Sequence, residues 1–116
     1  MDITDLNPSL AGSAGAIVAT ADSLNRFYGC LLAGELLEPA GMEQMLTFNN
    51  TGNYGLGIHR VELPCGLELW GHFCGIFGYL TCSYHSTDAA RHVTLSCTTG
   101  ATEPDINILE RIFTVQ

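Results

Sequence analysis

Between residues 54 and 98, apolar and polar side chains alternate, and this pattern constrains the fold more than any other feature of the sequence. Successive side chains of a β-strand point to opposite faces, so the alternation predicts strands with one apolar face each. Short turn-like stretches separate four such segments, at residues 54–63, 67–72, 79–86 and 92–98. In the first of them, Leu56 and Ile58 are predicted to share a face. The short connections favour an antiparallel meander.

Apolar residues at helical spacing precede the strands. Thr20 is a suitable N-cap, Asp22 lies near the positive end of the helix dipole, and Gly34 is a suitable stop. The apolar stripe between them consists of Leu24, Phe27, Tyr28, Leu31 and Leu32. The sequence therefore predicts an amphipathic helix between Thr20 and Gly34, preceded by an irregular lead-in over about the first ten residues.

Two further helices are predicted. One begins near Glu38-Pro39 and carries Met42, Met45 and Leu46 on one side. The other follows Thr102-Glu103-Pro104-Asp105, with Pro104 at the first helical position, and its apolar side consists of Ile106, Leu109, Ile112 and Phe113. The predicted fold class is α+β, an antiparallel sheet of about four strands packed against N-terminal and C-terminal helices. The 116 residues are predicted to form a single domain, 1–116.

The composition limits the kinds of partner. Charged residues make up only 14% of the chain, whereas about a quarter is usual, so apolar surface that another chain covers is expected. The net charge of −8 disfavours nucleic acid and anionic membrane surfaces. The start, Met1-Asp2-Ile3-Thr4-Asp5, is acidic where a signal peptide would be basic, so no signal peptide is predicted in this chain.

Three segments, in this order, resemble the serine β-lactamase / D-alanyl-D-alanine carboxypeptidase superfamily. Residues 13–27 resemble its "AGGLVSTADDLARF" helix, Asn53–Ile58 its "YGLGW" strand, and Gly71–Tyr79 its Gly-His-x-Gly-x-x-Pro-Gly-Tyr segment at the substrate edge. The resemblance implies that the domain corresponds to the C-terminal part of a serine hydrolase that transfers acyl groups from penicillins, D-Ala-D-Ala peptides or esters. It also implies a periplasmic or secreted location and no cofactor.

The resemblance assigns roles to residues of one strand. His72 matches the position where the family places a cation that attracts a substrate carboxylate, and Gly75 matches the residue whose backbone N–H gives half of the oxyanion hole. Phe73, Cys74 and Trp70 are predicted to contact substrate. Cys74 stands where the family has glycine, and Phe77 replaces the usual turn proline.

The nucleophile motifs of the family are absent. The sequence contains no lysine, so Ser-x-x-Lys cannot occur, and no tyrosine begins a Tyr-x-Asn motif. Ser23-Leu24-Asn25 has the form of a Ser-x-Asn motif but lies inside the predicted first helix, so it is attributed to chance. The first functional hypothesis is therefore a C-terminal fragment or derivative of such a hydrolase, inactive alone and completed by another chain. The alternative is a non-enzymatic binding or assembly module that self-associates into a homo-oligomer.

Two other chemistries are conceivable for His72 and Cys74, which alternation places on one face. They could form a Cys-His nucleophilic pair, or bind zinc together with Cys82 or His85. No orienting third residue supports the first, and chance explains the second, so no metal is predicted. Trp70 is either a cleft wall or a core residue. Cys74 is predicted to be the most accessible thiol, with Cys30 and Cys97 buried.

Overall fold

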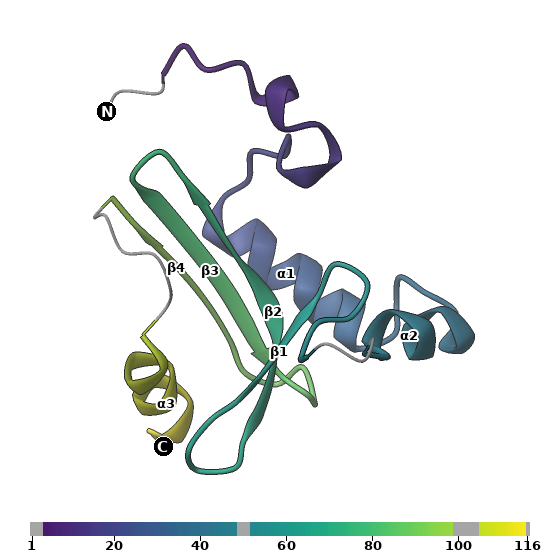
Figure 1. Cartoon of the computed structure of the whole chain (residues 1–116). Coiled ribbons are helices and arrows are strands. Elements are labelled where there is room, and N and C mark those ends of the chain that lie inside the picture. The colour runs from purple at the N-terminus through teal and green to yellow at the C-terminus, as the bar shows by residue number, and fades with distance from the viewer. Residues whose placement is uncertain (1–3, 49–51, 99–104, 116) are drawn as a thin grey trace.

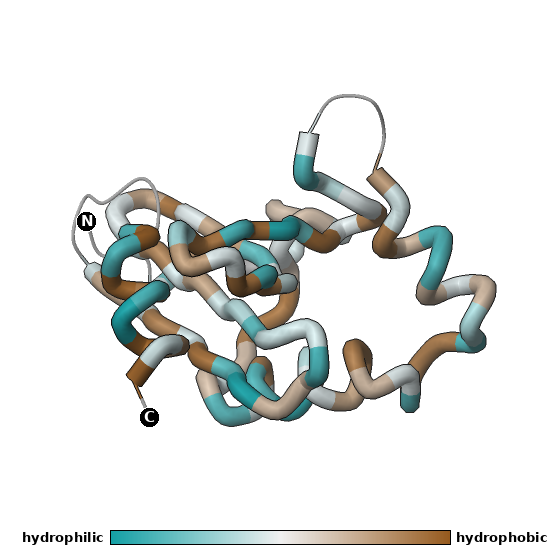
Figure 2. The backbone as a smooth tube through the Cα atoms, turned by 90° about the horizontal axis from the view of Figure 1, so that it is seen from below, coloured by the Kyte–Doolittle hydropathy of each residue, from teal (hydrophilic) through white to brown (hydrophobic). Residues whose placement is uncertain are grey.

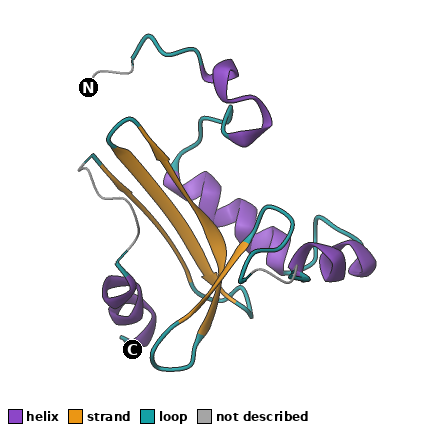
Figure 3. Cartoon of the chain, viewed as in Figure 1, coloured by secondary structure: helices purple, strands orange, loops and turns teal. Residues whose placement is uncertain are grey.

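The strands form one antiparallel sheet in the order β1-β2-β3-β4 (Figure 1). The computed structural model describes residues 4–48, 52–98 and 105–115. Within these ranges the elements are the 3-10 helix η1 (Pro8–Ala14), α1 (Ala21–Leu32), α2 (Pro39–Leu46), β1 (His59–Glu62), β2 (Glu68–Ile76), β3 (Tyr79–Ser86), β4 (His92–Cys97) and α3 (Ile106–Thr114). Helices precede and follow the sheet (Figure 3), which confirms the predicted α+β class.

Local signals set the bounds of α1. The Thr20 hydroxyl accepts a hydrogen bond from the Ser23 backbone N–H at 3.2 Å, as expected of an N-cap. Beyond the last turn, Gly34 adopts a positive φ of 76°, a conformation that glycine reaches without strain. Both ends of this helix agree with the sequence prediction.

The two faces of the sheet have different cores. On one face, Leu69 of β2 and Tyr84 of β3 pack against Leu109 and Phe113 of α3. On the other, Trp70 packs with a group that belongs to the two N-terminal helices and the segment before β1: Leu31, Met45 and Ile58. The sheet is therefore covered on both sides, and α1 and α3 lie on opposite faces.

Several predicted elements differ from the structure. The second strand is longer than residues 67–72, because it continues to Ile76. The first strand is shorter than residues 54–63, because Gly57 turns the chain with a φ of 75° and only His59–Glu62 is extended. Leu56 is consequently 69% exposed while Ile58 is buried, so they do not share a face. The N-cap of α3 is Asp105, so the helix begins after the predicted start; Pro104 lies outside the described residues.

The N-terminal segment and α2 extend away from the sheet (Figure 1). Residues 8–14, expected to be irregular in part, form η1. Leu10, Ile17 and Val18 are each more than three-quarters exposed. The region around α2, at the right of Figure 2, mixes hydrophobic and hydrophilic colours. Leu36 and Leu37, just before α2, are 50% and 39% exposed. No helix in the described ranges is long and apolar enough to cross a membrane.

Candidate functional site

The second half of β2 has an unpaired edge. β1 pairs with β2 only from Glu68 to Gly71, whereas β3 pairs with it from Leu69 to Ile76. From His72 onward, the other edge of β2 has no strand partner among the described residues. A free strand edge presents backbone donors and acceptors to which an extended ligand can bind.

The turn after β2 determines which backbone groups face this edge. β2 and β3 are joined by Phe77-Gly78, which have positive φ values of 43° and 93°. In a two-residue turn of this kind the flanking pair, Ile76 and Tyr79, is the hydrogen-bonded one, and hydrogen-bonded and open pairs then alternate. The N–H of Gly75 consequently points away from β3 and toward the unpaired edge. This direction suits the oxyanion role predicted for Gly75.

Phe77 cannot be replaced by proline in this turn. Proline fixes φ near −65°, whereas Phe77 has a φ of 43°. The turn proline of the superfamily that the sequence resembles is therefore replaced here by a different local geometry. An aromatic residue in the left-handed region is strained. Phe77, at the tip of the hairpin, is 56% exposed.

His72 lies at the unpaired edge, and each of its ring nitrogens contacts an oxygen atom of another residue. Its Nδ1 is 2.5 Å from the Phe73 carbonyl oxygen, and its Nε2 is 2.7 Å from the Tyr54 hydroxyl. Tyr54 comes from the segment before β1, where it forms an isolated bridge with His59. The sequence analysis did not find Tyr54, because a contact across 18 residues leaves no local signal.

The other predicted site residues are divided between the two faces. His72 and Cys74 pair with Ser83 and Thr81 and share the face covered by α1. Phe73 points to the opposite face, where it packs against the α3 core, so only its backbone reaches the edge. Trp70 is 6% exposed and stacked on Phe48 at 5.6 Å, which places it in the core.

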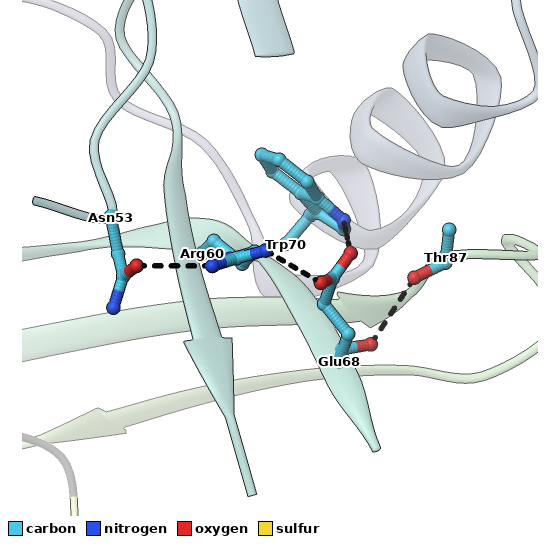
Figure 4. Close-up of polar contacts among 5 residues, drawn as sticks. All are labelled: Asn53, Arg60, Glu68, Trp70 and Thr87. Atoms are coloured by element: carbon cyan, nitrogen blue, oxygen red, sulfur yellow. Dashed lines mark hydrogen bonds and ion pairs between the residues drawn. The ribbon is translucent and has the colours of Figure 1, made fainter. Parts of the chain in front are cut away.

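A polar network supports Trp70 and the segment before Tyr54 (Figure 4). The Glu68 carboxylate accepts hydrogen bonds from Trp70 Nε1 and from Arg60 Nη1, both at 3.0 Å. Arg60 also donates to the Asn53 side-chain oxygen at 3.3 Å, and its guanidinium lies 4.6 Å from the Phe48 ring centroid. The network ties β1, β2 and the residue next to Tyr54 into one unit.

A buried hydroxyl chain runs under α1, and the sequence analysis missed it. His85 Nε2 lies 2.9 Å from the Ser83 hydroxyl, which lies 2.7 Å from the Thr94 hydroxyl. Thr94 donates to Asn25 of α1 at 2.7 Å, so Ser83 must donate to Thr94 and accept from His85. Because the imidazole donates to the serine, Ser83 is not activated as a nucleophile. Burial, and secondarily His92, lowers the pKa of His85 to about 4.

The zinc hypothesis is not supported. Cys82 pairs with Phe73 and lies on the α3 face, away from His72 and Cys74. His85 shares their face but is completely buried beside Ser83. Across residues 4–48, 52–98 and 105–115, no group of three potential ligands could hold a metal ion.

The cysteine predictions are corrected in part. Cys74 is exposed as predicted, but Cys65 is also exposed. Cys30 and Cys97, predicted to be buried, are only partly so, and Cys82 is the buried thiol. Alternation placed His72 and Cys74 on one face of β2, as the register confirms, but it could not show how deeply a helix covers each thiol.

Comparison with known proteins supports the hydrolase-like scaffold. No family model matches the sequence. A solved structure of a D-stereospecific amidohydrolase from Streptomyces sp. aligns with a TM-score of 0.85 and 31% identity, over 94% of this chain and 34% of that one. The chain thus spans about a third of the length of the amidohydrolase. That enzyme is a member of the penicillin-recognizing, β-lactamase-like serine hydrolase superfamily. This chain therefore has the fold of part of a β-lactamase-like hydrolase.

Proposed function

We propose that this chain, as a single domain, is the C-terminal, substrate-binding part of a β-lactamase-like serine hydrolase that acts on amide bonds. The observation that carries the proposal is the unpaired edge of β2, where the Gly75 N–H faces outward beside His72. The likeness to an amidohydrolase over 94% of the chain supports this reading of the edge.

In this proposal the strand binds and the nucleophile comes from elsewhere. The sequence has no lysine, so the serine and its lysine lie in residues outside it or in a complementing chain. The serine oxygen adds to the substrate carbonyl, the amine leaves with a proton, and water hydrolyses the resulting ester. Gly75 N–H donates to the carbonyl oxygen as it becomes an oxyanion. The exposed thiol of Cys74 narrows the space in which substrate can lie along the strand.

Binding to the isolated chain tests the proposal. An N-acyl-D-amino-acid amide is titrated while the backbone amide signals are followed by NMR, with its L-enantiomer as the control ligand. We expect the D-enantiomer to shift the Gly75 amide and the His72 ring more strongly than the L-enantiomer does. Shifts confined to residues under α3, or no shift at millimolar ligand, would contradict the proposal.

A turnover measurement accompanies the binding test. The isolated chain is expected to hydrolyse nitrocefin and D-amino-acid amides no faster than buffer, because it lacks an activated serine. The Cys74→Ala variant should behave identically. Turnover that disappears in this variant would instead assign a Cys-His mechanism to the strand.

A second candidate function is a self-associating assembly module on the same scaffold. The observation that favours it is the exposure of Leu10, Ile17 and Val18, which are 79%, 87% and 86% exposed. Apolar residues gathered on a surface often mark an interaction site. Light scattering at about 100 μM detects micromolar association. Dimers or larger species, together with no NMR shift at the β2 edge in the binding test, would favour this module over the hydrolase part.

A further inference from the structure

We propose that Tyr54 is a positioning residue for His72: its hydroxyl and the Phe73 carbonyl together hold the imidazole in one tautomer and along the edge of β2. We call these two contacts to the His72 ring the lock. The role of the lock in catalysis rests on the proposed function, but the existence of the lock does not. Two contacts carry the argument, at 2.7 Å to Nε2 and 2.5 Å to Nδ1.

The two partners determine where the proton lies. A backbone carbonyl oxygen can only accept, so the nitrogen facing Phe73 O must be protonated. In a neutral imidazole the other nitrogen is then an acceptor, and Tyr54 O–H must be the donor to His72 Nε2. The contact therefore selects the Nδ1–H tautomer, since each ring nitrogen is fixed by what the other one binds.

Tyr54 is held in place by its neighbours. The Arg60 backbone N–H donates to Asn53 O at 2.8 Å, and the Arg60 side chain donates to the Asn53 side chain (Figure 4). On the other side, Gly55 N–H donates to Ile58 O at 2.8 Å. A Cβ at Gly55 would lie 2.1 Å from Met45 O, so this close approach requires glycine. The backbone is thus held on both sides of Tyr54, although this residue is 43% exposed.

The lock changes what the edge offers to a ligand. His72 Nδ1 occupies the Phe73 carbonyl and Tyr54 occupies Nε2, so neither nitrogen presents an N–H to a carboxylate. By the alternation described above, the backbone N–H groups of Phe73 and Gly75 then remain as the outward donors on this stretch. Because both ring nitrogens are engaged, this edge suits an uncharged amide better than a substrate with a carboxylate beside the scissile bond.

NMR of the histidine side-chain nitrogens in the isolated chain tests the lock without any turnover. In the wild type, neutral His72 should be protonated on Nδ1. In Tyr54→Phe, Nε2 loses its donor. Because one hydrogen bond contributes about 1 kcal/mol, the ratio of Nε2–H to Nδ1–H tautomer should rise about fivefold. Arg60→Met keeps the Tyr54 phenol but removes the side-chain hydrogen bond from Arg60 to Asn53. This variant should shift the tautomer ratio less, but in the same direction.

Tyr84→Phe is the matched control, because the Tyr84 hydroxyl lies 3.3 Å from His59 Nδ1 in a second phenol–imidazole pair. It should alter the His59 signals and leave those of His72 unchanged. The proposal is overturned if wild-type His72 is protonated on Nε2, if Tyr54→Phe leaves its spectrum unchanged, or if Tyr84→Phe moves it equally. Any of these results leaves the hydrolase proposal to its own binding test, which does not depend on the tautomer.

Discussion

His85 should make the stability of this protein depend on pH. Its ring is completely buried, stacked on Tyr28 of α1 at 4.7 Å, and 5.9 Å from His92 of β4. Its Nδ1 has no hydrogen-bond partner in the described structure, so a proton there would be an unpaired charge in the core. Desolvation, with His92 as a smaller cause, accordingly lowers the pKa of His85 from 6.5 to about 4.

The direction and size of the effect follow from this pKa. As the pH falls below 6.5, the unfolded chain binds a proton at this position while the folded chain does not until about pH 4. The contribution of His85 to stability is therefore complete above the unfolded pKa and is lost as the pH decreases between these values. From about pH 7.5 to about pH 5, the free energy of unfolding should decrease by ~2 kcal/mol through this group.

Urea unfolding at the two pH values measures the change, with the single, buried Trp70 as the fluorescent probe. His85→Gln should be less stable at neutral pH, because the stack on Tyr28 is lost, yet its pH dependence should be smaller by ~2 kcal/mol. His92→Gln, at an exposed neighbour, should retain most of the wild-type dependence. A His85→Gln variant with the same pH dependence as the wild type would refute the reasoning.

Three further outcomes are expected. Gly71→Ala should destabilise the fold by about 1–3 kcal/mol or more in urea unfolding, because the new Cβ would lie 1.8 Å from the backbone oxygen of Ser83. Gly75→Ala should reduce the free energy of unfolding only slightly, because no atom lies closer than 3.8 Å to the new Cβ. Equal losses would contradict this. Phe77→Asn should stabilise the hairpin by on the order of 1 kcal/mol, since asparagine tolerates positive φ; a lower melting temperature would count against it. Iodoacetamide should label Cys74 well before the buried Cys82, whose thiol pKa is raised by burial, and the reverse order in mass mapping would show that the strand faces are exchanged.

The sequence predicted those elements whose bounds depend on residues close to them in the sequence. The Thr20 cap and the positive φ of Gly34 define α1 from a few residues each, and alternation predicted β3 with its observed bounds, Tyr79–Ser86. The first strand was overestimated, because the turn at Gly57 interrupts a pattern that otherwise continues.

The site was less predictable because it depends on contacts between distant residues. His72 and Gly75 were found from a motif, but Tyr54 reaches His72 only through the pairing of β1 with β2. The chain from His85 to Asn25 was also missed. Alternation separates polar from apolar faces, but it does not show that a helix covers the polar one.

The unequal pairing of β2 gives a single strand two levels of local stability. Its first half lies between β1 and β3, and its core side chains bind it to both faces of the domain. Its second half pairs, among the described strands, with β3 alone and ends in the strained turn at Phe77. Fluctuations of the hairpin can therefore displace the Gly75 edge by small amounts while Leu69 and Trp70 remain fixed. The strand can adjust to a ligand at one end without loosening the core at the other.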